Sequence, residues 1–569
     1  MLLPRALRRA LAVTAALVCL GGVAACGESG SRQLVTPPPT TQPVTPGLLV
    51  RTPQPRPNVL VIEADDMRWD DLRFMPHVRR LIQQRGLSFE NSFAPYPLCC
   101  PSRASFLTGQ YSHNHHVYSH LSPYGFGAFR DQHTIATVLQ GAGYRTALVG
   151  KYLNNYGQQP VRGTQRSSLR YVPPGWTQWY AGSDHRWPLG SPMYGGGTYS
   201  YFDLVENIDG QVHAYPGRYS TDVLAQQTRQ VIDGFGRQKS PWFVWWTPVA
   251  PHLGSPLEPD DPPPSVRRDG KVTVWGTPAR PAWVKGRFDH QVVHGAGTPL
   301  THSAEADVSD KPVFLRRLPE LTAAEKAAET EVTRQRAESL YVLDVEVART
   351  LTRLRETGQL ARTIVVFTSD NGYYLGEHRK RQGKINLHEP SLRVPLLIAG
   401  PGVPHGRRYD PVSTVDMAPT LAAYARTRMS AADGTSLLPL IRSGDQGWSR
   451  AVVTEGMMGF GRYRSHHRLG PAPLDTRGLR LGRWKLTRYS TGEAELYDLA
   501  KDPLELHNLA HVPRYQSVFE GMKQLYAVYA DCKEAACRAP LPAAWQLGPA
   551  QEKRITDHEV ARTNAYFGN

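Results

Sequence analysis

The run Asn58-Val59-Leu60-Val61-Ile62, which continues into Glu63-Ala64-Asp65-Asp66, decides the fold of this chain. An apolar run rich in β-branched residues is typical of a strand that is buried on both faces of a sheet. Similar runs recur downstream, at 146–149, 242–246, 364–367 and 394–398. Because helical patterns lie between these runs, they predict an α/β fold with a large central, mostly parallel sheet flanked by helices.

The clearest of the helical patterns covers about residues 323–356, and Gly358 is a suitable stop for it. Near the end of the chain, 481–486 and 495–499 look like strands of a smaller C-terminal α+β domain. We therefore expect four parts. They are a signal peptide at 1–26, a Pro- and Thr-rich tether at 27–57, a main domain at 58–425, and a smaller domain with a terminal helix and tail at 426–569.

The composition is that of a globular protein with a basic surface. The 569 residues are too many for one ordinary core, which agrees with one large and one smaller domain. Lys and Arg outnumber Asp and Glu by 66 to 50, for a formal charge of +16. This excess favours a polyanionic partner such as a sulfated glycan, an acidic surface or nucleic acid. A solvated basic surface without any partner would give the same count.

The N-terminus has the features of an export signal. The first ten residues contain three arginines, Arg5, Arg8 and Arg9. They precede an apolar run at 11–25 that is too short to span a bilayer comfortably. Val23-Ala24-Ala25-Cys26 resembles the bacterial lipobox, in which the cysteine becomes a lipidated N-terminus; a cleavable signal with an incidental cysteine is the alternative. No later apolar run is long enough to cross a membrane. We expect a lipid-anchored protein of the bacterial cell surface, in contact with the membrane only through its lipid, or else a secreted one.

The six cysteines fall into three groups, of which one belongs to the signal region, Cys19 and Cys26. Export permits disulfides, and the other four thiols allow three full pairings. Cys532 and Cys537 are close in sequence and look like a small local disulfide. The adjacent Cys99 and Cys100 need another explanation.

Polar residues follow four of the predicted strands, as Asp65-Asp66, Gly150-Lys151, Pro251-His252 and Asp370-Asn371. In an open α/β sheet the ligand site lies beyond the carboxyl ends of the strands, so we expect these tips on one rim. Their carboxylate and amide oxygens suit Ca²⁺ or Mg²⁺ better than zinc. Taken separately, an Asp pair after a strand is often a turn or a helix cap, and Asn-Gly is a common hairpin turn.

The segment from Cys99 to Gly109 predicts a short helix with Cys99 at its N-terminus. Pro101 suits the first turn of such a helix and Gly109 suits its end. Free N–H groups and the helix dipole favour an anion at the N-terminus, and Arg103 can turn back toward it. A plain reactive thiol at Cys99 is one interpretation, because helix N-termini lower the pKa of cysteine. A disulfide is another, although vicinal bridges are strained.

Cys99-x-Pro101-Ser102-Arg103, followed by Leu107-Thr108-Gly109, resembles the signature of the type I sulfatases, which share an alkaline-phosphatase-like fold. The resemblance covers about residues 58–510. It implies that a formylglycine-generating enzyme oxidises Cys99, not Cys100, to formylglycine (3-oxoalanine). Hydration of that aldehyde gives a geminal diol, of which one hydroxyl attacks sulfur and the other later expels sulfate. The main domain would then be the catalytic domain of a sulfuric ester hydrolase.

The resemblance also implies one divalent cation, Ca²⁺ or alternatively Mg²⁺, held by Asp65, Asp66, Asp370 and Asn371. Lys151 matches the lysine that bridges the diol and the sulfate, and His252 matches the histidine that contacts the sulfate. Lys384 matches a second sulfate-binding lysine, and Arg103 supports the nucleophile. Together these groups would neutralise charge on the sulfuryl group as the ester bond breaks.

One position departs from the family pattern. Many relatives carry a histidine two residues after the lysine, where it helps to regenerate the aldehyde, but this chain has Leu153. His113, His115 or His116 could be the base for this second step, although clustered histidines are more often loop or core residues. The runs at 99–101, 112–116 and 151–154 are closer to the N-acetylglucosamine-6-sulfatase branch.

Aromatic residues crowd a glycine-rich region between the rim segments: Trp176, Trp179, Tyr180, Trp187, Tyr194, Tyr199 and Tyr201. Aromatic faces in a basic field could hold a sulfated sugar, or they could simply pack the loop onto the body. With the resemblance, they favour a 6-O-sulfated N-acetylglucosamine unit of a glycosaminoglycan as substrate. A small aryl sulfate ester is the alternative, and we expect no nucleic acid partner.

Two other function classes remain open. A related phosphodiesterase or phosphonate monoester hydrolase would share the α/β body and an anion site. A non-catalytic, surface-tethered polyanion-binding protein would keep Cys99 unmodified, but it would leave the set of charged site residues unexplained. An α/β fold alone does not choose among these classes, so the choice depends on the site.

Overall fold

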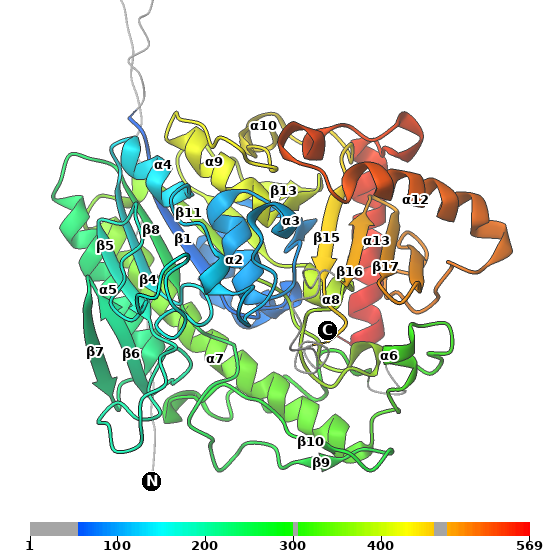
Figure 1. Cartoon of the computed structure of the whole chain (residues 1–569), viewed down its shortest axis with the longest axis horizontal. Coiled ribbons are helices and arrows are strands. Elements are labelled where there is room, and N and C mark those ends of the chain that lie inside the picture. Colours follow the sequence, from blue (N-terminus) through cyan, green and yellow to red (C-terminus); the bar gives the residue numbers. More distant parts are fainter. Residues whose placement is uncertain (1–54, 300–304, 460–474, 569) are drawn as a thin grey trace, which may run out of the picture. The chain divides into compact units, whose positions relative to one another are not determined.

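The apolar run at the start of the body forms the middle of a ten-stranded sheet in this computed structural model, which describes residues 55–299, 305–459 and 475–568 (Figure 1). Five parallel strands make its centre, in the order β11 (Thr363–Ser369), β1 (Asn58–Ala64), β8 (Trp242–Thr247), β4 (Arg145–Gly150) and β5 (Gln178–Gly182). Beyond β11 lie β12 (Leu396–Ala399), β2 (Leu87–Phe89) and β13 (Gly406–Arg408). Beyond β5 lie β6 (Asp203–Ile208) and β7 (Gln211–Pro216). The predicted fold class is confirmed.

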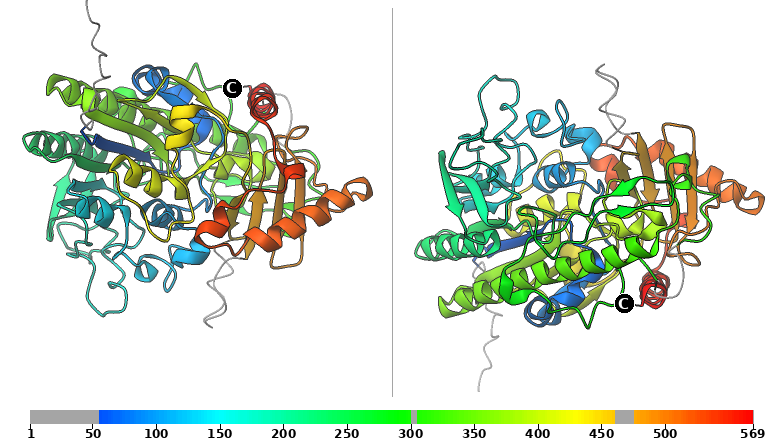
Figure 2. Two further views of the ribbon diagram at one scale, coloured as in Figure 1. Left: turned by 90° about the horizontal axis from the view of Figure 1, so that it is seen from above. Right: turned by 90° about the horizontal axis from the view of Figure 1, so that it is seen from below.

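Helices cover both faces of this sheet (Figure 2). One face packs against α2 (Cys99–Thr108), α4 (Ile135–Gly141), α9 (Met417–Tyr424) and α10 (Leu438–Ser443). The other packs against α1 (Pro76–Leu81), α5 (Ser220–Gly236) and α7 (Ala323–Glu356). In β1, Val59 and Val61 face the first layer, and Leu60 and Ile62 face the second. A strand covered on both sides has no polar face, which explains its unbroken apolar run.

The long helix α7 has the bounds that its sequence predicts. Thr322 caps it, because its side chain accepts a hydrogen bond from the Glu325 backbone N–H, and the Glu325 carboxylate accepts one from Thr322 N–H. This reciprocal capping box satisfies two amide groups that the first turn leaves free. At the other end, Gly358 takes a φ of 67°, which reverses the chain toward β11.

A second, antiparallel sheet lies beside the first, together with α12 (Gln516–Tyr529) and α13 (Pro549–Phe567) (Figure 1). Its strands are β15 (Val452–Gly456), β16 (Thr476–Arg480), β17 (Trp484–Tyr489) and β18 (Ala494–Asp498). The prediction of a single strand at 481–486 was wrong: Leu481 N–H bonds to Trp484 O, and this turn separates β16 from β17. The boundary expected between residues 425 and 426 stays a prediction.

Buried ion pairs join this second sheet to the rest of the body. Arg480 in β16 contacts Glu389 at 3.1 Å and Glu559 of α13 at 3.2 Å. Lys485 in β17 contacts Glu389 at 3.4 Å and Glu505 at 2.6 Å. Glu389 begins the short helix α8 (Glu389–Leu392). The second sheet therefore helps to hold the segment that follows the predicted site residue Lys384.

The predictions of export and lipidation concern residues 1–57, of which the structure describes 55–57; Cys26 lies outside the described residues. The described residues from Pro55 onward belong to one compact unit. In those residues, no helix has both the length and the apolar composition that crossing a membrane requires.

Glu552 in α13 is an acidic side chain that folding buries beside Asp410. Burial, reinforced by Asp410, raises the pKa of Glu552 to about 10 from its ordinary 4.5. Between these pH values unfolding releases a proton from Glu552, so its contribution lowers stability as the pH rises. We expect Glu552→Gln to raise the free energy of unfolding at pH 8 by at least about 1 kcal/mol, with little effect at pH 4, in urea denaturation. Glu520→Gln, at an exposed position of α12, is the control. The same pH dependence in all three proteins would contradict this account.

Candidate active site

The carboxyl ends of four parallel strands bring the predicted polar tips together. Asp65 follows β1 and its N–H bonds to Ala250 O, next to His252 at the end of β8. Lys151 follows β4 and its N–H bonds to Thr247 O, and Asp370 follows β11 and bonds to Ala64 O. These backbone bonds continue the strand pairing past the sheet, so side chains distant in sequence reach one rim.

Cys99 is the first residue of α2 and is completely buried. Its Sγ lies 3.2 Å from Asp65 Oδ1 and 3.7 Å from Asp66 Oδ1, and Lys384 Nζ donates to it at 2.7 Å. The helix ends at Gly109, whose φ of 70° turns the chain away as its sequence predicts. The structure thus brings the N-terminus of α2 to the same rim.

Three buried carboxylates at this rim are each paired with a cation. Lys151 Nζ lies 2.5 Å from Asp65 Oδ2, Arg103 Nε lies 2.8 Å from Asp370 Oδ2, and Lys384 Nζ contacts Asp66. Arg103 also donates to Lys151 O at 3.1 Å. The three carboxylates and three cations balance one another in formal charge, as a water-poor site requires.

The pairing decides which of these groups are charged. Burial would raise the pKa of Asp66, but Lys384 outweighs it and holds that pKa at about 2. Burial would also raise the pKa of Asp65, which Lys151 instead keeps below its ordinary value. For Cys99, burial and then Asp370 raise the thiol pKa well above its ordinary value. Asp65 and Asp66 are therefore ionised near neutral pH, whereas an unmodified Cys99 is a protonated thiol.

Two oxygens at the rim have no hydrogen-bond partner among the described residues, Asp66 Oδ2 and Asn371 Oδ1. Both are buried, and Asn371 Nδ2 donates to Asp66 Oδ1 at 2.6 Å, which fixes the two side chains against each other. Ligand atoms of Asp65, Asp66, Cys99 and His252 lie within 4.8 Å of one another. Oxygens left without a donor are costly unless a cation takes them, so these residues fit a hard divalent cation.

The open side of the site is formed by Lys384 and His252, whose side chains are 9% and 13% exposed. His252 Nε2 lies 3.5 Å from Asp66 Oδ2. Its pKa is lowered by burial, although Asp65 and Asp66 oppose that effect, so the ring is neutral near pH 7. An anionic ligand would therefore enter past one ammonium group and one neutral imidazole.

Tyr199 comes from the aromatic region, and it is part of this site. Its ring lies 4.7 Å from the His252 ring and 5.1 Å from Lys151 Nζ, and its hydroxyl accepts from Asn154 Nδ2 at 2.5 Å. Trp176 and Trp179 instead pack in the core beneath the sheet. The packing interpretation is confirmed for Trp176 and Trp179, and the binding of a sugar by the aromatic region stays a prediction.

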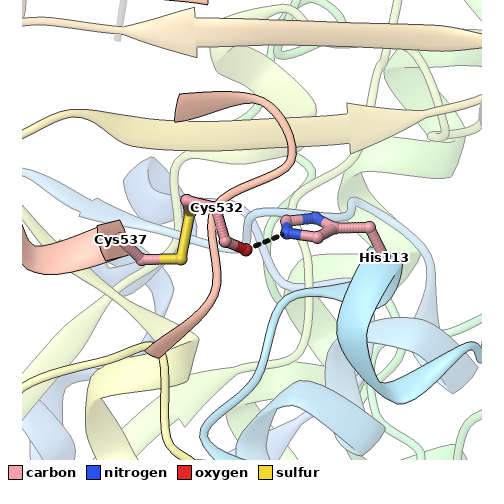
Figure 3. Close-up of side chains that lie close together, drawn as sticks. All are labelled: His113, Cys532 and Cys537. Atoms are coloured by element: carbon pink, nitrogen blue, oxygen red, sulfur yellow. Dashed lines mark hydrogen bonds between the residues drawn. A yellow bond between two sulfur atoms is a disulfide. The ribbon is translucent and has the colours of Figure 1, made fainter. Parts of the chain in front are cut away.

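The three clustered histidines are not placed to act on Cys99. They follow the C-terminal end of α2, and the residue of α2 that His115 contacts, Ser105, is six residues from Cys99, or about 9 Å along the helix axis. His113 bonds to Glu455 at 2.7 Å and to Cys532 O at 2.7 Å, and Figure 3 draws the second of these bonds. His115 Nε2 bonds to Ser105 Oγ, and burial lowers its pKa to about 3. His116 Nδ1 bonds to the Tyr118 hydroxyl.

His113 also lies beside Cys532 and Cys537, a grouping that resembles a metal site. The two sulfurs are joined in a disulfide with an S–S distance of 2.04 Å, and both nitrogens of His113 have hydrogen-bond partners (Figure 3). The cluster therefore fastens α3 (Ser112–His115) to the segment after α12, and it has a structural role.

His120 is a further histidine near Lys384 and Lys151 that the sequence analysis did not single out. Its pKa lies well below the ordinary value, because of burial first and then of the positive charges of Lys384 and Lys151. Its carbonyl oxygen accepts from Asn155 Nδ2 at 2.5 Å, four residues after Lys151. In the sequence it is one more histidine of a histidine-rich run, and its position depends on the path of the loop that follows α3.

The family models and several relatives that match this chain are sulfatases. The family model of the sulfatases matches residues 57–427, and a model of the C-terminal part of N-sulphoglucosamine sulphohydrolase matches residues 376–530. The arylsulfatase of Volvox carteri is 30% identical over 528 residues, which cover 85% of this chain and 76% of the relative. N-acetylglucosamine-6-sulfatase of Homo sapiens is 29% identical over 425 residues, covering 72% and 68%.

A solved structure, BT4656 in complex with its substrate D-glucosamine-2-N,6-O-disulfate, is also similar. The TM-score is 0.59 at 22% sequence identity, over 83% of this chain and 97% of that one. At this identity the likeness concerns the fold.

The burial and pairing of Cys99 generate a prediction about its reactivity. In the unmodified, chelator-treated chain, the thiol is inaccessible and protonated because burial and Asp370 raise its pKa. We expect iodoacetamide at pH 8 to modify it at least about tenfold more slowly than in the urea-unfolded chain, as measured by peptide mass spectrometry. Cys100, whose pKa burial raises to about 12, is the internal reference. Equal rates in the folded and unfolded chain would support the reactive-thiol interpretation instead.

Proposed function

The chain belongs to the sulfatase family and is a sulfuric ester hydrolase, and we propose that its nucleophile is a formylglycine formed from Cys99 beside one divalent cation. The observation that carries this proposal is the position of Cys99, buried at the N-terminus of α2 among Asp65, Asp66 and Lys384. When present, formylglycine supplies a hydrated aldehyde with one hydroxyl for attack and one for release of sulfate. Because Cys99 is completely buried, a formylglycine-generating enzyme would have to oxidise it before folding is complete.

The cation would be held by Asp65, Asp66, Asp370 and Asn371. Asp66 Oδ2 and Asn371 Oδ1, which accept no hydrogen bond from any described residue, support this assignment. All four donors are hard oxygens, which suits Ca²⁺ and, as an alternative, Mg²⁺. When bound, the cation supplies positive charge against the oxygens of the sulfuryl group.

The protein's own cations would bind and orient the sulfate. Lys384 Nζ already donates to Sγ of Cys99, so it can hold the nucleophilic oxygen that replaces the sulfur and an oxygen of the sulfate. Lys151 is held by Asp65, and Arg103 fixes Asp370 by its bond of 2.8 Å. These fixed donors lower the cost of reorganising the site as charge shifts to the leaving group.

Two histidines are candidates for proton transfer, His252 and His120. Burial lowers the pKa of both, so they are neutral near pH 7 and can accept a proton. Because Leu153 replaces the usual histidine, we propose that one of them is the base that regenerates the aldehyde. His252 is favoured because one of its ring nitrogens lies within 4.8 Å of the Cys99 sulfur.

Charge balance supports an anionic substrate. The negative charges of Asp65, Asp66 and Asp370 are already offset by Lys151, Lys384 and Arg103 before any metal ion binds. A divalent cation would leave the site with two uncompensated positive charges. A sulfate ester would offset one of these charges and the sulfate product would offset both, in a site where unpaired charge is costly.

We propose a 6-O-sulfated N-acetylglucosamine unit of a sulfated glycan as the substrate. The similarity to N-acetylglucosamine-6-sulfatase supports it, as does Tyr199, whose ring stands beside Lys151 and His252 where a sugar ring attached to the sulfate would lie. A small aryl sulfate is the alternative. A phosphonate monoester hydrolase would need the same anion site, so it is tested beside the sulfatase activity.

Export and anchoring through a lipid on Cys26 complete the proposal. The arginines, apolar run and lipobox-like sequence at 1–26 support it. Two relatives are named extracellular sulfatases, which agrees with export.

The reaction is tested by the release of inorganic sulfate from 6-O-sulfated N-acetylglucosamine, with protein from a host that contains the maturing enzyme. Residue 99 should be found as the aldehyde or its hydrate by peptide mass spectrometry. Cys99→Ala should lower kcat/KM at least about 1,000-fold. Cys100→Ala is the matched control and should keep most of the activity, because Cys100 packs in the core.

Three results would change the proposal. Active protein with an intact thiol or a disulfide at Cys99 would contradict the mechanism. Faster hydrolysis of a phosphonate monoester than of any sulfate ester would favour the second function class. Release of sulfate from an aryl ester but not from the sugar would contradict only the substrate.

Asn371 tests the cation, because its Oδ1 has no hydrogen-bond partner among the described residues; replacement by Ala also removes the Nδ2 bond to Asp66. We expect Asn371→Ala to weaken Ca²⁺ binding at least about tenfold, measured by titration calorimetry on chelator-treated protein, with Mg²⁺ in parallel. Asp233→Asn, on an exposed ion pair of α5, should bind as the natural chain does. Unchanged affinity in Asn371→Ala would remove this residue from the ligand set.

A further inference from the structure

The end of the sheet opposite the catalytic rim is formed by the amino ends of β1, β4, β8 and β11. The segments that lead into these strands are bonded to one another. The Tyr144 hydroxyl donates to Pro57 O at 2.9 Å, Arg145 N–H to Pro241 O at 3.0 Å, and Trp242 Nε1 to Gln359 Oε1 at 2.9 Å. The strands are six or seven residues long, so about 20 Å separates this end from the rim.

Exposed basic side chains gather on this surface, which we call the basic end: Arg85, Arg237, Lys239, Arg355 and Arg362. They come from the ends of η2 (Gln83–Arg85), α5 and α7 and from the turns into β8 and β11. The acidic residues of the segments 233–241 and 353–362 are Asp233 and Glu356, and both contact Arg353. These segments therefore carry a net positive charge at the surface.

An apolar pocket of about 280 Å³ lies among these cations. Its lining includes Ile82, Leu351, Leu360 and Val365, and Arg85 and Arg355 also line it. Arginine binds phosphate oxygens through its planar guanidinium, and the pocket offers room for hydrocarbon beside it. The chemistry of the basic end therefore suits an amphiphile with an anionic head.

We propose that the basic end docks on an anionic membrane surface, with its arginines at the lipid phosphates. Charge complementarity carries the argument, and the described chain also enters the body here, at Pro55–Pro57 before β1. In this orientation the catalytic rim faces away from the bilayer. The expected lipid on Cys26 would hold the chain near the membrane but would not determine which surface of the protein faces it. The basic end supplies the second contact that stable and oriented binding needs.

A soluble sulfated glycan is the competing polyanion. It has no hydrocarbon for the pocket, and a glycan held at the basic end would lie about 20 Å from Cys99 along the strands. The proposal is independent of the reaction, so failure of one does not decide the other.

Binding is measured by co-sedimentation of the mature chain from residue 26 onward carrying Cys26→Ser, which removes both the expected acylation site and the basic, apolar signal segment. Vesicles of equal parts phosphatidylglycerol and phosphatidylcholine are compared with vesicles of phosphatidylcholine alone. We expect at least tenfold tighter binding to the anionic vesicles, falling as NaCl is raised. Changing Arg237, Lys239, Arg355 and Arg362 together to Glu should abolish this preference.

A matched control changes the same number of charges on other exposed positions, Arg268, Lys501, Lys533 and Arg554, and should keep the preference. Sulfate release from a soluble ester, or for an inactive preparation the melting temperature, verifies that both variants fold. Three outcomes would overturn the proposal. They are no preference for anionic vesicles, equal losses in the two variants, and binding of a soluble sulfated glycan at the basic end without binding to vesicles.

Discussion

The mutual neutralisation of buried charges at one end of the sheet is the constraint on which this structure depends. Asp65, Asp66 and Asp370 are almost completely buried, and each contacts a cation from a different part of the chain. Without Lys151, Lys384 and Arg103, the carboxylates would have to bind protons or leave the interior. With them, the site stays ionised and ordered before any ligand arrives.

The same constraint explains why many elements of the fold serve to position the residues of the rim. Four parallel strands deliver one or two rim residues each, α2 delivers Cys99 and Arg103, and the segment before α8 delivers Lys384. That last segment is fixed by Glu389, which the buried Arg480 and Lys485 of the second sheet hold. The small antiparallel sheet thus contributes to the site without supplying a residue to it.

The two ends of the central sheet have opposite characters. The carboxyl ends form the rim, where the charged side chains are buried and paired. A metal ion bound there would leave an excess of positive charge, which favours binding of an anion. The amino ends carry cations at the surface around an apolar pocket, where they are solvated and adaptable. The full length of the parallel strands separates the rim from the basic end. Catalysis and the proposed membrane contact therefore use different surfaces of the protein.

The sequence by itself determined five strands of the central sheet (β1, β4, β8, β11 and β12), the long helix, the class of fold and the grouping of the polar residues that follow the strands. Buried parallel strands can be recognised in the sequence as unbroken apolar runs. The polar residues that follow such strands lie at the same edge of the sheet, so Asp65, Lys151 and Asp370 could be grouped from the sequence alone. It did not separate His113, His115 and His116, which pack around the far end of α2, from His120, nor Tyr199 from the packing aromatics. It also joined 481–486 across a turn. Those distinctions depend on the paths of irregular loops, which follow from tertiary packing and not from any local period. Only the tertiary structure could decide them.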